Sequence, residues 1–345
     1  MQLSDSEIKQ QTRRLWETVF GDSQDFIDLY FSKKYTPEAN MVRIENGAVV
    51  AAAQWLPYEA LFWGVRVKSS YLSGLVTRPD CRGKGHAAAI IGEGLKRLYA
   101  EDVPLAWLIP ANESLRDLYE RPSHGCFYTG VFRVEKWLTA REHVAAGFEV
   151  VNAAPSAAIA QYVHRALSRY GSGLLPSLSD VQAAFSLCEM EQGKAVAVLR
   201  EGNICGLALA VKEKQDVWRL SFVETDDSAS EAALLAALAA ETGAQRFRSL
   251  QPTVWVDDEA QPYGMVRVVN VERLLQLIQP SFSEQPMCVE IVADEILPQN
   301  NGRYLLSKNF VGRTDQPAEM QLTPGELAVL LMQTHEVSMP MMLDE

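Results

Sequence analysis

Several patterns that would assign a function directly are missing from this sequence. The five cysteines are scattered without a C-x-x-C pair and the five histidines are isolated, so neither a disulfide framework nor a zinc site is indicated. No apolar run approaches the ~18 residues of a membrane-spanning helix. The first residues lack the basic start and apolar core of a signal peptide. We therefore expect a reduced, cytoplasmic protein that binds no metal and no membrane.

Positive charge is also scarce. The 345 residues carry a formal net charge of −12, which argues against an extended nucleic-acid-binding face, so no nucleic-acid partner is expected. The hydrophobic share of 48% is enough for large cores. The length predicts two or three domains, since domains usually hold roughly 100–200 residues.

The common nucleotide-binding motifs are absent, but a related arrangement is present. Neither G-x-G-x-x-G nor a Walker pattern occurs. Instead, a strand pattern over 71–77 is followed by Pro79, by the turn Arg82-Gly-Lys-Gly85, and by helical spacing over 87–100. A helix start presents unpaired N–H groups and the positive end of its dipole, and glycines let a phosphate approach closely. The stretch therefore predicts a cradle for a pyrophosphate.

The turn resembles the acetyl-CoA-binding motif of the GNAT acetyltransferase superfamily, R/Q-x-x-G-x-G/A, through Arg82-x-x-Gly85-x-Ala87. The resemblance implies that backbone N–H groups of the turn hold the pyrophosphate and that the preceding strand bonds the pantetheine arm. His86 would then act through its amide, with its ring in solvent. The cofactor-binding residues implied in this way are Leu75, Val76, Thr77, Arg82, Gly83, Lys84, Gly85, His86, Ala87 and Asn112. For Asn112 a helix cap is an equal alternative.

The order of elements up to residue 140 resembles the whole GNAT core. A capping box at Ser4-x-x-Glu7 begins a first helix, and Asn46-Gly47 predicts a hairpin. The expected order is two helices, an antiparallel meander, the phosphate turn and its helix, a strand, a helix and a final strand. In that fold two neighbouring strands splay apart around the pantetheine arm, and here they would be 71–77 and 105–109.

Tyr119 is the candidate general acid. The passage Asn112-x-x-Leu115-x-x-Leu118-Tyr119 resembles the family segment N-x-x-A-x-x-L-Y, whose tyrosine protonates the departing thiolate of CoA. The family usually places a glycine four residues after that tyrosine, whereas here Pro122 intervenes and Gly125 follows at six. The alternative is a core tyrosine at helical spacing from Leu115.

Two further α/β patterns follow. Residues 141–262 repeat the order of the first domain, but the acidic stretch 223–227 replaces the glycine-rich turn and would repel a pyrophosphate. Residues 263–345 resemble the junction and last domain of acetyltransferases of the enhanced-intracellular-survival (Eis-like) type. The resemblance implies an α/β (α+β) fold with a catalytic GNAT domain at 1–140, a degenerate GNAT-like domain at 141–262, and a sterol-carrier-like domain at 263–345.

The end of the chain offers a candidate base. In the resembled family the α-carboxylate of the last residue, here Glu345, takes the proton from the acceptor amine. The chain ends Pro340-Met-Met-Leu-Asp-Glu345, and three apolar residues so near the end predict that the tail docks. Several carboxylates close together would raise one another's pKa, which suits a base near neutral pH.

The function implied is an acetyl-CoA-dependent N-acetyltransferase, in which a primary amine attacks the thioester directly in a ternary complex. A covalent route through Cys81 is a weaker reading because the sequence assigns it no base. A non-catalytic acyl-CoA-binding regulatory module and a lipid carrier are the alternatives from other classes. The acceptor stays open among small-molecule and peptide amines, and the resemblance implies a homo-oligomer.

Overall fold

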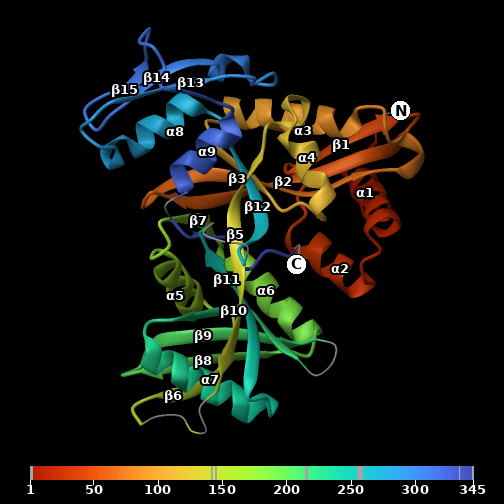
Figure 1. Ribbon diagram of the computed structural model, residues 1–345. Coiled ribbons are helices and arrows are strands. Elements are labelled where there is room, and N and C mark those ends of the chain that lie inside the picture. Colours follow the sequence, from red (N-terminus) through yellow and green to blue (C-terminus); the bar gives the residue numbers. More distant parts are fainter. Residues whose placement is uncertain are drawn as a thin grey trace.

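The computed structural model describes residues 3–140, 143, 146–213, 217–254, 259–333 and 335–343. Within these ranges the strands form one 13-stranded sheet and a separate sheet of four strands. Figure 1 shows two lobes, one above the other, that share the long sheet, with the C-terminal elements packed on the upper lobe. This is a mixed α/β fold with a splayed sheet flanked by helices, as the sequence predicted.

The upper lobe follows the expected order closely. The capping box at Ser4 is formed, and the left-handed Gly21 ends the first helix with φ 72°. Asn46 and Gly47 have φ 51° and 75° and close the predicted hairpin. The helices are α1 (Asp5–Phe20), α2 (Gln24–Lys33), α3 (His86–Ala100) and α4 (Arg116–Glu120). The strands are β1 (Asn40–Glu45), β2 (Ala48–Phe62), β3 (Val65–Thr77), β4 (Leu105–Leu108) and β5 (Tyr128–Thr139).

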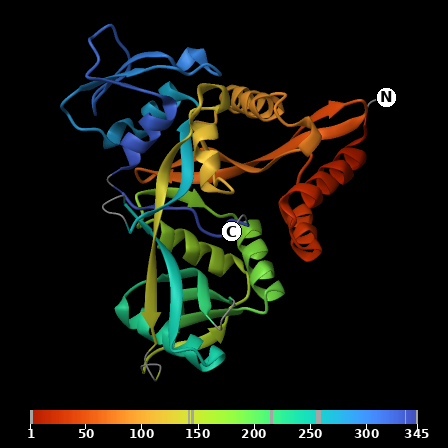
Figure 2. The ribbon, with the colours of Figure 1, turned by 45° about the vertical axis from the view of Figure 1, so that its right-hand side comes forward.

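One strand of the upper lobe comes from far along the chain. β12 (Gln261–Val268) lies between β4 and β5, with Met265 opposite Leu108 and Val266 opposite Tyr128. The far half of β5 pairs instead with β11 (Arg246–Thr253) of the lower lobe. β5 therefore runs through both lobes, as Figure 2 shows. Sheet pairing thus crosses the predicted domain boundaries at 140 and 262.

The lower lobe contains the elements expected between 141 and 262. Its remaining strands are β6 (Glu149–Asn152), β8 (Lys194–Arg200), β9 (Asn203–Lys212) and β10 (Trp218–Thr225). One hydrophobic cluster packs α5 (Ala157–Leu167) and α6 (Leu178–Met190) on one face of the sheet, and another packs α7 (Ser228–Thr242) on the opposite face. β10 and β11 are parallel neighbours joined through α7, as β3 and β4 are joined through α3.

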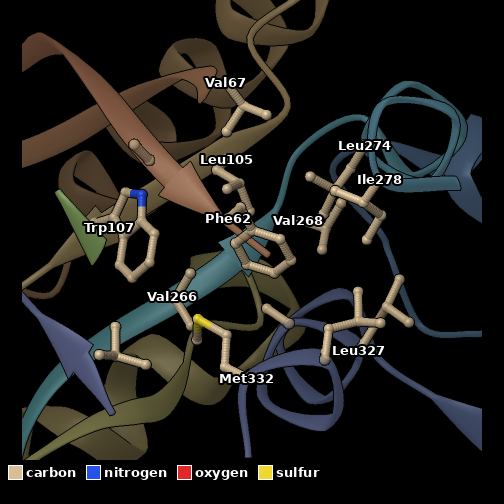
Figure 3. Close-up of a cluster of buried hydrophobic side chains, with 14 of the residues drawn as sticks. Phe62, Val67, Leu105, Trp107, Val266, Val268, Leu274, Ile278, Leu327 and Met332 are labelled. Carbon is tan, nitrogen blue, oxygen red and sulfur yellow. The ribbon is translucent and has the colours of Figure 1, made fainter. Parts of the chain in front are cut away.

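The C-terminal elements pack on the upper lobe through a shared core. The strands β13 (Met287–Ile291), β14 (Gly302–Leu306), β15 (Val311–Arg313) and β16 (Met320–Leu322) form the small sheet. The helices α8 (Val271–Ile278) and α9 (Pro324–Met332) contribute Leu274 and Leu327 to a cluster that also holds Phe62 and Trp107 of the long sheet. Figure 3 shows these side chains together.

The C-terminal tail threads between the lobes. β17 (Val337–Ser338) pairs parallel with β7 (Ser172–Leu175), which itself pairs with β2. Gly173 permits this approach, because a Cβ there would lie 2.2 Å from the Ser338 carbonyl oxygen. The side chains from Met341 to Leu343 are buried, so the tail is docked as far as the structure describes it. Asp344 and Glu345 lie outside the described residues.

Candidate active site

The glycine-rich turn has the geometry of an anion cradle. Gly83 and Gly85 take left-handed φ values of 77° and 80°, and a Cβ at either would meet no atom within 4 Å. Gly85 is the N-cap of α3 and provides no side-chain hydrogen bond to the helix start. The first amide groups of α3 therefore have no side-chain cap, and the space before them is open. This leaves both the donors and the positive end of the helix dipole available to an anion.

Two exposed cations flank the turn. Arg82 Nε donates to the carbonyl oxygen of Thr77 at 3.3 Å, which ties the turn back to the end of β3. Lys84 Nζ lies 3.8 Å from Glu45 Oε2 at the end of β1. Both side chains can reach solvent, so they can turn toward a bound phosphate.

The expected solvation of the His86 ring is wrong. The side chain is only 12% exposed, and Nε2 lies 3.3 Å from Glu45 Oε1, although the orientation does not make a hydrogen bond. Glu45 therefore sits against both His86 and Lys84. The hairpin that carries Glu45 covers the ring, an approach that local sequence around His86 does not reveal. The backbone amide of His86 remains at the start of α3, where the resemblance put it.

The strands β3 and β4 separate where the pantetheine arm was expected. Their parallel pairing ends at Leu72 and Leu108, whereas β3 continues to Thr77, paired only with β2 through Val76 and Thr77. The edge of β3 from Leu75 to Thr77 consequently has no β4 ladder beside it. Amides of an extended arm can bond such an edge.

Tyr119 is buried in the core beside this edge. It is 7% exposed and shares a hydrophobic cluster with Leu108 and with the partly buried Leu75. Phe127 meets its ring edge-on at 6.4 Å. Burial raises the pKa of Tyr119 to about 12. The phenol is therefore protonated at neutral pH, as a general acid must be. Its close packing fits equally well the alternative that Tyr119 is a core residue without a catalytic role.

The segment from Asn112 to Tyr119 is less helical than expected. It forms a short 3-10 turn over Glu113–Leu115 and then the five-residue α4. Asn112 makes no side-chain cap bond, and its Oδ1 accepts from Ser114 Oγ at 2.6 Å. Cys81 is buried, with its sulfur 3.2 Å from Arg78 Nη2, so burial shields this thiol from an acyl donor.

A buried arginine that the sequence analysis missed holds the loop behind Tyr119. Arg267 of β12 is 0% exposed and donates to the Gly125 carbonyl oxygen at 2.6 Å and to Asp294 Oδ2 at 2.7 Å. Asn300 donates to the same carboxylate oxygen at 2.9 Å. The loop closes on itself through Phe127 N and Tyr119 O at 2.9 Å. Gly125 lies six residues after Tyr119 instead of the usual four, and in this position its carbonyl oxygen accepts the hydrogen bond from Arg267. Its only sequence signal is a lone charge within the apolar run 265–269.

The docked tail reaches the α1–α2 side of the same sheet. Leu343 belongs to a cluster with Trp16 and Tyr30 of the first two helices and Ala183 of α6. Tyr30 donates its hydroxyl hydrogen to Ser73 Oγ of β3 at 2.7 Å. Ser73 precedes the free edge of β3 by two residues. The last described residue of the tail thus packs near the splayed strand.

Comparison with known proteins is consistent with this geometry. Residues 2–122 match the family model of the Acetyltransferase (GNAT) domain. A GCN5-related N-acetyltransferase from Anabaena variabilis is similar over 95% of this chain and 88% of its own, with a TM-score of 0.77 and 17% identity. Eis1 from Mycobacterium abscessus is similar over 96% and 88%, with a TM-score of 0.74 and 12% identity. A probable N-acyltransferase from Enterococcus faecalis is similar over 94% and 87%, with a TM-score of 0.75 and 15% identity. No curated protein matches the sequence.

The matches show the fold and support a class of reaction. At these identities the solved structures show a shared fold, and the match over 2–122 supports acyl transfer, for which the GNAT family uses acetyl-CoA. Among the described residues, no cluster of three or more His, Cys, Asp or Glu could hold a metal ion. No helix within those same ranges has the length and apolarity needed to cross a membrane.

Proposed function

We propose that the protein is an acetyl-CoA-dependent N-acetyltransferase that acts on a primary amine. The observation that carries this proposal is the uncapped start of α3, with two left-handed glycines, placed directly after the free edge of β3. The turn would bind the pyrophosphate, and the edge from Leu75 to Thr77 would bond the pantetheine arm. The same edge would polarise the thioester carbonyl with a backbone N–H group.

The chemistry follows from these placements. The neutral amine attacks the thioester carbonyl carbon, the C–N bond forms, and the C–S bond breaks. The proton lost by the amine passes to a base, and the departing thiolate takes the phenol proton of Tyr119. Tyr119 is protonated at neutral pH, as this role requires, but a pKa of about 12 makes its phenol a weaker acid than an ordinary tyrosine, so the support for the role comes from its position beside the edge of β3. The burial of Tyr119 also keeps bulk water from competing for that proton.

The α-carboxylate of Glu345 is our proposed base. Support comes from the tail, which is buried to Leu343 beside Tyr30 and α6. Deletion of Asp344 and Glu345 should lower turnover on the order of 10²-fold, typical for a missing general base, with acetyl-CoA affinity nearly unchanged. A C-terminal tag should impair turnover in the same way, whereas an N-terminal tag should not. Full activity in both C-terminal variants across the pH range would place the base elsewhere.

The acceptor is the part of the proposal that needs direct measurement. An acetylation screen over an amine library with mass detection would compare aminoglycosides, polyamines, and lysine or N-terminal amines of peptides. Acetylated product with at least one class is the expected result. Stoichiometric acetyl-CoA binding without any product would instead favour the regulatory binding module.

The organisation of the chain is also part of the proposal. We infer a catalytic unit at 1–140 that borrows β12, a degenerate GNAT-like unit at 141–262, and a sterol-carrier-like unit at 263–345. Support for the last comes from its small sheet with α8 and α9 beneath it. A cytoplasmic location and a homo-oligomeric state complete the proposal. Sedimentation velocity would measure the oligomer, and lipid extraction from purified protein would test the carrier reading.

A further inference from the structure

The lower lobe contains a second gap between parallel strands. β10 and β11 pair over only three positions, and the last pair joins Leu220 and Ser249. Beyond it β10 continues beside β9 as far as Thr225, and β11 continues beside β5 as far as Thr253. Each strand is therefore held by its outer neighbour while the facing edges diverge. The ladder between β3 and β4 also ends before β3 does, but there β4 itself ends at Leu108 with the last pair.

A cavity of about 160 Å³ lies in this second gap. Its walls are the diverging parts of β10 and β11, Arg133 of β5, Arg169 and Tyr170 after α5, and the tail from Ser338 to Pro340. A cavity of roughly 150 Å³ can hold a molecule the size of benzene, so this one has room for one or two amide units.

The end of the gap next to α7 is closed to phosphates. Asp227 caps α7 by accepting from Ser230 N at 2.8 Å, so its carboxylate occupies the position that an anion would need. Arg200 pairs with Asp227 at 2.8 Å, and Arg165 pairs with Asp226 at 3.0 Å. Because both arginines already form ion pairs with these carboxylates, their charge is not left for a phosphate. A pyrophosphate would meet two carboxylates and a helix start that already has a cap.

The charges around the cavity balance. Arg169 pairs with the buried Glu224, which also accepts from the Tyr170 hydroxyl at 2.9 Å. Arg133 donates to the Met339 carbonyl oxygen at 3.1 Å, and Glu231 of α7 also lines the cavity. Two guanidinium groups and two carboxylates therefore leave the lining without net charge. This favours a neutral, polar ligand over an anion such as intact CoA.

We infer that the gap between β10 and β11 binds a neutral, extended chain that carries secondary amides. Strand edges that lose their ladder partner offer N–H and C=O groups to an extended amide chain. Here the exceptions are the Thr225 carbonyl oxygen, which accepts from Arg169 at 2.7 Å, and Pro252, which has no N–H. Both the phosphate-free pantetheine arm and the backbone of a short peptide have this chemistry. The inference concerns binding only and holds whether or not the upper lobe transfers acetyl groups.

The test is a titration of the full chain with pantetheine, with N-acetylalanine N-methylamide, which like pantetheine has two amides, and with CoA. We expect one of the first two to bind and to slow amide hydrogen exchange at Ser338 and Met339, since these residues belong to the wall of the cavity. The Gly85→Glu variant should bind that ligand equally well, because its change lies in the other gap. Comparison of the two probes identifies the source of the amides.

Variants of the cavity give the decisive comparison. Gln251→Trp fills it from β11 and should weaken binding at least 10-fold, while Gln321→Trp on the outer face of β16 is the matched control. Ser221→Leu fills it from β10 by a smaller step if the tryptophan variant does not fold. The inference is overturned if neither neutral probe binds at millimolar concentration, if both filling variants bind like wild type, or if CoA protects the amides of Ser338 and Met339 as pantetheine does.

Discussion

The chain contains the same strand–turn–helix frame twice, with opposite chemistry at the turn. Between β3 and α3 the turn has left-handed glycines, open space and no side-chain cap. Between β10 and α7 the turn has Asp227, which forms a capping box with Ser230 and pairs with Arg200. The backbone frame is alike, yet the first helix start leaves its N–H donors for a ligand and the second uses them internally. The residues of the turn, rather than the fold, decide which copy can bind a pyrophosphate.

The largest expected effect comes from giving the first turn the charge of the second. Gly85→Glu places bulk and a carboxylate in the open cradle. The new carboxylate would repel the pyrophosphate at the same helix start, so the affinity for acetyl-CoA should fall by at least about 100-fold. Calorimetry measures it. Gly243→Glu is the control, because Gly243 ends α7 with a similar φ of 74° and equally open space. A folded Gly85→Glu with wild-type affinity would remove the phosphate assignment.

The next effect separates a catalytic tyrosine from a structural one. Tyr119→Phe keeps the ring but removes the proton donor, and turnover should fall roughly 10–10⁴-fold with acetyl-CoA affinity nearly kept. Because the pKa of Tyr119 is about 12, its contribution to the rate should be constant from pH 6 to 10. In the lower lobe, Tyr162 donates to the Glu224 carbonyl oxygen at 2.9 Å. Tyr162→Phe should cost stability of about 1 kcal/mol and leave turnover unchanged. Equal rates in both variants would place Tyr119 in the core only.

A third test compares two buried ion pairs, one that joins the two lobes and one that lies behind Tyr119. Lys34 of the upper lobe pairs with Asp180 of α6 and donates to the Tyr58 hydroxyl at 2.7 Å, and the pair is buried. Removal of one partner from such a pair usually destabilises by about 3–5 kcal/mol, so Asp180→Ala and Asp294→Ala should each lower the urea midpoint strongly. Asp294→Ala should also lower turnover, because Arg267 would lose the partner that helps it hold the loop behind Tyr119. If the two variants had equal turnover, Arg267 would not position the loop behind Tyr119 for catalysis.

The smallest effect concerns how the stability contributed by the second turn, between β10 and α7, depends on pH. Hydrogen bonds from Arg200 and Ser230 hold the pKa of Asp227 well below its ordinary value. A carboxyl whose pKa is lowered by folding stabilises the protein above its unfolded pKa of about 3.9, and that contribution is lost as the pH falls further. The wild type should therefore lose more thermal stability between pH 6 and pH 3 than Asp227→Asn, which lacks this carboxyl. Thermal denaturation at the two pH values measures the difference in unfolding midpoint for each protein. An identical pH dependence in the variant would contradict the bonding seen at this turn.

Local signals explain what the sequence could predict. The capping box at Ser4, the Asn46-Gly47 hairpin, and the turn that ends at Gly85 depend on neighbouring residues, and the structure contains each of them. The contact of His86 with Glu45 and the burial of Arg267 depend on residues distant in sequence, and no local pattern encodes them. The position of β12 could not be predicted for the same reason, since a strand pattern predicts a strand but not its neighbours.

The placement of β12 also sets an order of events during synthesis. A ribosome releases β4 and β5 long before it releases residues 261–268, which belong between them. Until then the nascent chain carries two strand edges that face an empty place, and such edges are open to wrong partners and to chaperones. The loop behind Tyr119 must wait as well, because Arg267 arrives on the same strand. A chain released before residue 268 would have the phosphate turn but not a finished sheet beneath its candidate acid.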